Sequence, residues 1–364
     1  MAPVKLPFYA RVALLLHGLA LLLLFMYLGR TIFIPLFFAF LVAILLHPLD
    51  VRFEKIGIPR LVAGLLALLI FIVVIGGLIY FFSKQVVRFS KDLPHIEQKF
   101  SQKIQDIQQG ISDKYHINDT QQTNYINKST SGLVNAVVNS LATTFVGIAE
   151  FVVLTIFFFV FTFFMLYHRR LLMEFLLSLF DKAHDKRVVG ITFQVRSVIY
   201  NYVLGLLTEM VILIILIFTA LTIMGIKYAL LMSVLAAVLN IIPYLGIYTA
   251  LFISMGITLA NGTSGEAIGI GIVFLIAHFL DVNVILPRIV GGRVKMNPFI
   301  TIVAVLVGHL IWGIPGMFLF IPLTAIIRIV SEEIEDLKPL AILIGEEKKS
   351  SAVENRSKQR QKST

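Results

Sequence analysis

Cysteine is absent from this chain of 364 residues, and charged residues are scarce. The lack of cysteine excludes disulfides, thiol catalysis, cysteine-ligated zinc and iron–sulfur clusters. Charged residues make up 14% of the chain, whereas an ordinary soluble domain has about 25%. The sequence motifs of zinc proteases, serine hydrolases and phosphate-binding loops are missing as well. We therefore expect no enzyme, no cofactor and no bound metal.

Hydrophobic residues, in contrast, make up 58% of the chain and recur in long runs. A helix needs about 20 predominantly apolar residues to cross a bilayer. The runs of that length are 8–29, 31–49, 61–83, 133–167, 200–224 and 266–286. The first is long for a secretory signal and lacks a cleavage site, so we interpret it as a retained span. The pattern predicts an all-α integral membrane protein with about 7–8 transmembrane helices plus two hairpins formed by the shorter runs described next.

Two pairs of shorter apolar runs are separated by proline and glycine. Each arm has about 15 residues, or about 22 Å of helix, against a hydrocarbon core of about 30 Å. The pairs are 228–242 with 245–260, and 298–312 with 316–330. They predict two re-entrant hairpins, although pairs of short full spans remain an alternative. The residues that break the helices at the tips are Asn240, Pro243 and Gly246 in the first pair and Gly313, Pro315 and Gly316 in the second.

The basic residues lie in short loops and near the C-terminus, which accounts for the net charge of +10 without nucleic acid. The positive-inside bias then places both termini in the cytoplasm. In this orientation span 200–224 runs outward before a hairpin that opens from outside, and span 266–286 runs inward before a hairpin that opens from inside. This is the pattern of an inverted repeat, in which transporters place the binding site at discontinuous helices.

The long polar segment after the third span contains an amphipathic pattern. Apolar residues recur at spacings of three and four over 93–111, and Pro94 suits the first turn of a helix. This helix either lies against its own membrane domain or makes a subunit contact.

The chain as a whole is expected to contain six regions. They are 1–83, N-terminal transmembrane helices; 84–131, extracytoplasmic insertion; 132–167, long transmembrane helix; 168–199, amphipathic cytoplasmic connector; 200–331, core transport region; and 332–364, cytoplasmic polar tail.

Ionisable residues inside the apolar runs are the candidate functional residues. Such groups cost several kcal/mol in a membrane and usually face a partner, a cavity or a transport path. His278 and Asp281 are three residues apart and share a helix face, where they could bind a cation or exchange a proton. Glu209 is the only acid of its span, and Asn283 lies on roughly the opposite face from Asp281. The alternatives are an ion pair of Asp281 with Arg288 and an inter-helix hydrogen bond for Glu209.

Short motifs in the second half of the chain resemble the autoinducer-2 exporter family of bacterial membrane proteins. They include residues 240–246, 286–291, 297–299 and 313–316. The resemblance implies a multi-pass transporter of the bacterial inner membrane that forms a homo-oligomer, a pentamer in the family. It also implies one of two substrates: autoinducer-2, a small polar signal of quorum sensing, or sodium or lithium in exchange for protons.

We therefore expect a secondary-active transporter that moves a small polar solute such as autoinducer-2 and is coupled to an ion gradient. Glu209, His278, Asp281 and Asn283 are its expected path and coupling residues, and the lipid bilayer is its environment. Three alternatives stay open. The chain could be a sodium(lithium)/proton antiporter, an oligomeric passive pore, or a membrane scaffold that binds partners through its amphipathic segments.

Overall fold

The computed structural model describes residues 7–115, 151–242, 246–289 and 296–346. Within these ranges the chain is helical and forms no strand beyond one isolated bridge between Met296 and Gly345. The all-α prediction is therefore confirmed. Five of the described helices are long and apolar enough to cross a membrane, or six if a bent pair at 151–178 counts as one span. The expected count was higher. Run 8–29 contributes only the shorter apolar helix Leu16–Leu28, and three of the four shorter runs form helices of 10–17 residues: Ala229–Leu239, Gly246–Ala260 and Pro298–Trp312.

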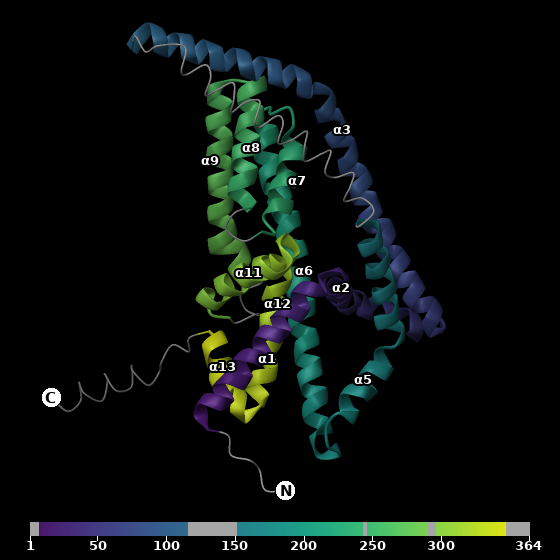
Figure 1. Cartoon of the computed structure of the whole chain (residues 1–364). Coiled ribbons are helices and arrows are strands. Elements are labelled where there is room, and N and C mark those ends of the chain that lie inside the picture. The colour runs from purple at the N-terminus through teal and green to yellow at the C-terminus, as the bar shows by residue number, and fades with distance from the viewer. Residues whose placement is uncertain (1–6, 116–150, 243–245, 290–295, 347–364) are drawn as a thin grey trace, which may run out of the picture. The chain divides into compact units, whose positions relative to one another are not determined.

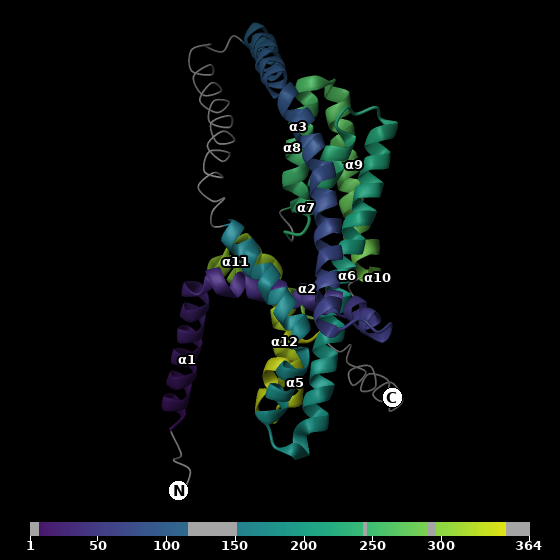
Figure 2. The same ribbon diagram turned by 90° about the vertical axis from the view of Figure 1, so that its right-hand side faces the viewer.

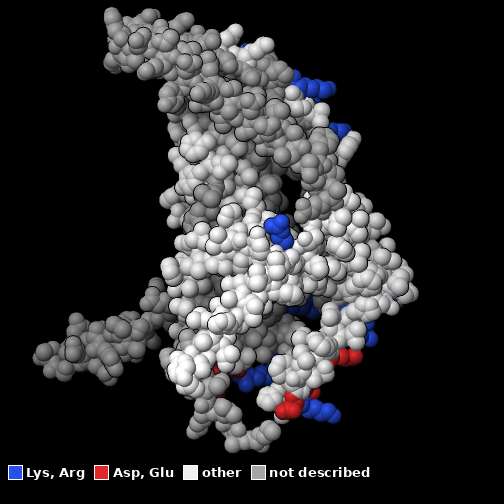
Figure 3. Space-filling view, viewed as in Figure 1, with Lys and Arg blue, Asp and Glu red and all other residues white. Residues whose placement is uncertain are grey.

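The surfaces of these helices are apolar, as a lipid environment requires. Large hydrophobic side chains such as Leu65, Leu69 and Val73 are exposed along the third helix. Figure 3 shows that few acidic or basic residues interrupt the described surface on the face it presents. Since water would not stabilise so much exposed apolar surface, these faces fit contact with lipid.

The chain divides into two compact units. The first consists of Met1–Leu45, His168–Gly205 and Val290–Thr364, and the second of Leu46–Tyr167 and Leu206–Ile289. The first unit holds α1 (Phe8–Leu28), most of α2 (Arg30–Lys55), α5 (Arg169–Ser178), the start of α6 (Asp185–Ile223), α11 (Pro298–Trp312), α12 (Ile314–Glu333) and α13 (Lys338–Ile344) (Figure 1). Because α6 is continuous through residue 200, the expected connector 168–199 and the span after it share one helix.

Helices α11 and α12 form a hairpin at the second pair of short runs, but α12 has 20 residues rather than the expected 15 or so and is one of the helices long enough to cross a membrane. Asn297 caps α11 by accepting a hydrogen bond from the Phe299 N–H at 2.9 Å. Gly313 reverses the chain at φ +64°, a conformation that favours glycine. Past the turn the two helices touch through glycine: a Cβ on Gly308 or Gly316 would meet the carbonyl oxygen of the other. The hairpin is therefore closed by backbone-to-backbone packing.

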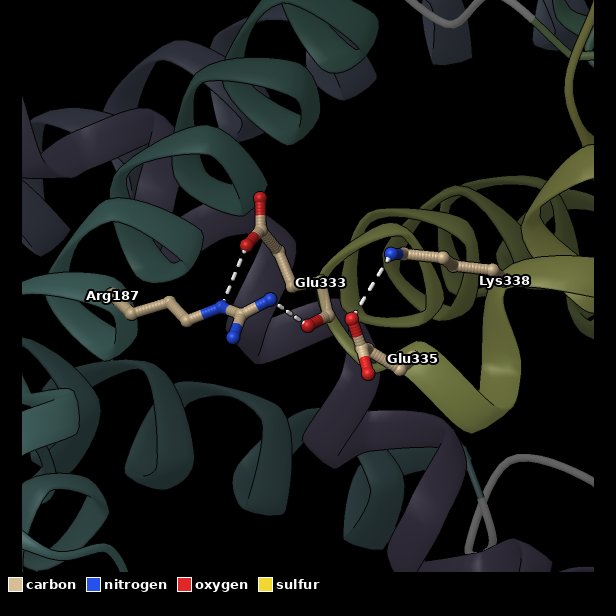
Figure 4. Close-up of polar contacts among 4 residues, drawn as sticks. All are labelled: Arg187, Glu333, Glu335 and Lys338. Carbon is tan, nitrogen blue, oxygen red and sulfur yellow. Dashed lines mark hydrogen bonds and ion pairs between the residues drawn. The ribbon is translucent and has the colours of Figure 1, made fainter.

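Side-chain contacts hold both ends of this hairpin within the first unit. Near the turn, the Trp312 indole donates to the carbonyl of Met26 in α1 at 2.9 Å. At the other end, Arg187 of α6 donates to the Glu333 carboxylate at 2.8 Å and to the Glu333 carbonyl (Figure 4). The chain then continues through a short 3-10 turn into α13, which packs on α12. The expected polar tail thus begins as ordered structure.

The second unit is a bundle in which α6 to α9 pack together. It holds α3 (Arg60–Tyr115), the helix Phe151–Tyr167, the rest of α6, α7 (Ala229–Leu239), α8 (Gly246–Asn261), α9 (Ser264–Leu280) and α10 (Leu286–Ile289). Figures 1 and 2 show α7, α8 and α9 side by side, and α3 packs against α7 and α8. The core of this bundle is apolar and includes Ile217, Met232, Ala250 and Phe274.

Helix α3 corrects the expected helix start at Pro94. It runs without a break for 56 residues, so the third span and the amphipathic segment are one helix, which bends along its length in Figure 1. Proline removes one helical hydrogen bond, and outside the membrane water can satisfy the freed carbonyl. Nearby, the Asp92 carboxylate accepts hydrogen bonds from Lys227 at 2.7 Å and from the Tyr228 hydroxyl at 2.5 Å. The bond to Asp92 raises the pKa of Lys227.

The glycine contact gives a direct test of the second hairpin. We expect Gly316→Ala to destabilise the protein by about 1–3 kcal/mol, because the new methyl group must displace the Gly308 carbonyl. The measurement is the thermal unfolding midpoint of the purified protein in detergent. Gly190→Ala is the matched control, since a Cβ there meets no atom within 4 Å in the same unit. Equal midpoints for the two variants would contradict the glycine packing.

Candidate functional site

Three polar side chains from three helices meet inside the second unit. The Asn240 amide nitrogen donates to Glu209 Oε1 at 3.0 Å and to Asp281 Oδ2 at 3.1 Å. Glu209 lies in α6, Asn240 caps the C-terminus of α7, and Asp281 follows the last residue of α9. Two of the predicted coupling residues and one predicted tip residue therefore form one group.

Both acids of this group are buried. Glu209 is 5% exposed and Asp281 is 4% exposed. Each also keeps one buried oxygen, Glu209 Oε2 and Asp281 Oδ1, that has no hydrogen-bond partner in the described part of the chain. A buried carboxylate without full hydrogen bonding or a counter-charge is costly. The two free oxygens therefore mark a place suited to a proton or a cation.

The helix geometry changes at Asp281. After α9 ends at Leu280, residues Asp281–Ile285 form a π-helical turn that leads into α10 and Pro287. The chain stays helical through Pro287. Short π segments of this kind often occur at functional sites. Asn283 lies in the same turn but is exposed and donates to the Phe279 carbonyl at 2.8 Å, so it is not part of the group.

His278 lies about one helical turn before Asp281 on α9. Its ring makes an edge-to-face contact with the Tyr248 ring of α8, with centroids 5.2 Å apart. Its Nδ1 atom is buried, with no hydrogen-bond partner among the residues that the structure describes. The imidazole therefore lies about one helical turn from the carboxylates along the helix.

The tip of the first hairpin holds Asn240 in place. Gly246 begins α8 so close to α7 that a Cβ on it would meet the Leu239 carbonyl. This close approach fixes the end of α7 from which Asn240 extends. Pro243 falls outside the described residues, whereas the second hairpin's Gly313, Pro315 and Gly316 shape a turn in the first unit.

The ion pair considered for Asp281 is not formed. Within the described ranges Asp281 accepts from Asn240, and no ion pair joins it to Arg288. The described residues also contain no group of three histidines and acids that could hold a metal ion. The group is therefore a pair of acids bridged by a neutral amide.

The sequence analysis missed another buried acid, Asp50, which is 1% exposed near the end of α2. It lies close to Gly64 of α3, where a Cβ would be 4.0 Å from Asp50 Oδ1. The signal was available, because an acid that directly follows an apolar run is a candidate for burial. The basic residues around it suggested a solvated loop instead.

Known proteins resemble this chain over most of its length. Residues 16–336 match the family described as AI-2E family transporter. The proposed transport protein YhhT of Escherichia coli strain K12 is 26% identical over 336 residues, which cover 92% of this chain and 94% of that protein.

Two further relatives also have names that describe transport. The proposed transport protein YrrI of Bacillus subtilis strain 168 is 24% identical over 312 residues, covering 83% of this chain and 86% of that protein. The proposed permease PerM of Escherichia coli strain K12 is 27% identical over 138 residues, covering 38% of this chain and 39% of that protein. The apolar helices and this family match support a membrane transport role, and the chain belongs to the AI-2E transporter family.

Proposed function

We propose that this protein is a secondary-active transporter of the bacterial inner membrane, with both termini in the cytoplasm, and that Glu209, Asn240 and Asp281 form its ion-coupling site. One observation carries the proposal: a single amide bridges two buried acids, and each acid keeps a free oxygen. Intramembrane acids in this arrangement are typical of ion and proton pathways.

The two acids cannot both be ionised without a cost. Since both carboxylate oxygens bond the same nitrogen, they lie within roughly 6 Å of each other, and two full charges at that distance repel by about 3 kcal/mol at an effective dielectric constant of about 20. The amide donates a hydrogen bond to each acid but brings no positive charge. A proton on one acid, or a cation between the two, removes the repulsion. Proton and cation therefore compete for the same place.

The ligands favour a small hard cation. Carboxylate oxygens suit ions that prefer oxygen donors, and sodium and lithium belong to this class. His278 lies about one helical turn from Asp281 on the same helix, with its buried Nδ1 atom unpaired among the described residues. Antiport of sodium or lithium against protons needs only these residues.

The family description favours a transported solute in addition to the ion. We propose that the coupling ion drives export of a small polar molecule of the autoinducer-2 type, as the family description suggests. Antiport without a solute is the second candidate, and the oxygen ligands of the acid pair favour it. A homo-oligomer, a pentamer by the family resemblance, is part of the proposal. Movement of substrate against its gradient would distinguish a carrier of either kind from a passive pore.

Neutralising either acid tests the coupling site. We expect Asp281→Asn and Glu209→Gln to slow cation-driven proton movement at least tenfold, because the amide side chains cannot exchange a proton for a cation. Proteoliposomes with a pH-sensitive dye inside report the movement when sodium, lithium or potassium is added. Asp92→Asn is the matched control, since Asp92 bonds Lys227 and Tyr228 outside the site. A wild-type rate of cation-driven proton movement in Asp281→Asn would contradict the proposal.

Removing the Asn240 amide, which bridges the two acids, tests the binding of the cation. We expect Asn240→Ala to raise the cation concentration for half-maximal proton movement by roughly 10-fold or more, since hydrogen bonds to charged groups contribute about 1.5–3 kcal/mol. The same proteoliposome assay gives this value from a cation titration. In Asn283→Ala the lost amide bonds only its own helix, so the value should stay unchanged. Equal shifts in the two variants would show that the bridge has no role in binding.

A further inference from the structure

Two buried hydroxyl groups on α8 have no hydrogen-bond partner among the described residues. Ser254 is 0% exposed and Thr258 is 4% exposed, and they lie four residues apart, so they share one face of the helix. Leaving a hydroxyl buried and unpaired costs about 1–3 kcal/mol. Two such groups on one face call for an explanation.

Other hydroxyls in the helices show the usual way of avoiding this cost. The side chains of Thr162, Thr192, Thr222 and Thr324 each donate to the carbonyl four residues earlier. Ser233 on the neighbouring helix α7 donates to Leu230. Ser254 and Thr258 make no such bond. Their hydroxyls are therefore available to a ligand inside the bundle.

The packing of α8 on α9 places these hydroxyls relative to the acid pair. Tyr248 contacts His278, and Met255 lies next to Gly271, so the two helices run antiparallel. Going away from Asp281, the polar atoms follow in the order His278, Ser254, Thr258. At a rise of 1.5 Å per residue, Ser254 lies roughly 9 Å along the axis from Tyr248, and Thr258 about 6 Å further.

Two of the three buried α9 residues at this level are small, Gly271 and Ala267, and the third is Ile270. Five buried atoms of the second unit have no hydrogen-bond partner in the described ranges: Glu209 Oε2, Asp281 Oδ1, His278 Nδ1, Ser254 Oγ and Thr258 Oγ1.

We infer that Ser254 and Thr258 form a second binding step for the cation and its water, between the acid pair and the turn that joins α8 to α9. The inference rests on the proposed cation coupling and extends it to the route by which the cation arrives. Hydroxyl oxygens bind a partly hydrated sodium or lithium ion, and hydroxyl hydrogens donate to its water. On such a route the ion loses its bound water in two stages, so the free-energy cost of dehydration is divided between the hydroxyls and the acid pair.

The absence of cysteine from the chain gives a clean test, because each introduced thiol is the only one. The variants are Ser254→Cys and Thr258→Cys in the full-length protein in proteoliposomes. The control is Ala260→Cys, two residues beyond Thr258 and therefore on another face of α8, 1% exposed and within the apolar core. We expect a small cationic methanethiosulfonate reagent to label the first two variants at least fivefold faster than the control. Saturating sodium or lithium should slow that labelling severalfold.

Labelling of Ser254→Cys and Thr258→Cys no faster than that of Ala260→Cys would overturn the inference, as would labelling that neither cation slows. A second measurement does not depend on the thiols. Ser254→Ala and Thr258→Val remove the hydroxyls with little change in volume, and we expect the half-maximal cation concentration for proton movement to rise severalfold. An unchanged value in both variants would also overturn the inference.

The experiments distinguish an error in the proposed cation coupling from an error in the hydroxyl step alone. If the proposed coupling is wrong, the wild-type protein shows no cation-driven proton movement. If only the hydroxyl step is wrong, the wild-type protein transports normally, and the two thiols on the hydroxyl face react no faster than the thiol at position 260.

Discussion

The pair of hydrogen bonds from the Asn240 amide to two buried acids is the interaction on which the second unit depends. Without it, the carboxylates that α6 and α9 bury would lose their shared neutral donor, and buried carboxylates without hydrogen bonds are costly. The bridge requires three helices to bring a polar side chain to the same depth. Asn240 does so as the C-cap of α7, and Asp281 as the first residue of the π turn that follows α9.

The two hairpins join short helices in different ways. In the second, Gly308 and Gly316 bring the backbones together, Asn297 caps the first arm, and the Trp312 indole bonds α1, so the polar groups near both ends of α11 are satisfied. In the first, Gly246 packs tightly on the end of α7, yet the polar side chain beside it faces two acids. The second hairpin is therefore built for close packing, and the first for holding an amide inside the bundle.

Much of the fold and part of the candidate site could be predicted from the sequence, because hydropathy and helix-breaking residues act locally. The bounds 298–312 of the second hairpin's first arm were correct, and the intramembrane acids were visible because such residues are rare. The meeting of Glu209, Asn240 and Asp281 was not predictable, since it depends on how three helices pack. Pro94 was misread as a helix start because sequence alone does not show where water replaces a lost hydrogen bond. Ser254 and Thr258 looked like ordinary helix residues until their burial and missing bonds were seen.

Competition between a proton and a cation at one buried acid pair is the central claim, and proton release on cation binding tests it most directly. Purified protein in detergent and weak buffer is titrated with lithium or sodium while the pH is recorded. We expect close to one proton released per cation bound, and no release from a variant with both Glu209→Gln and Asp281→Asn. Cation binding without proton release, or unchanged release from the double variant, would show that the exchange takes place elsewhere.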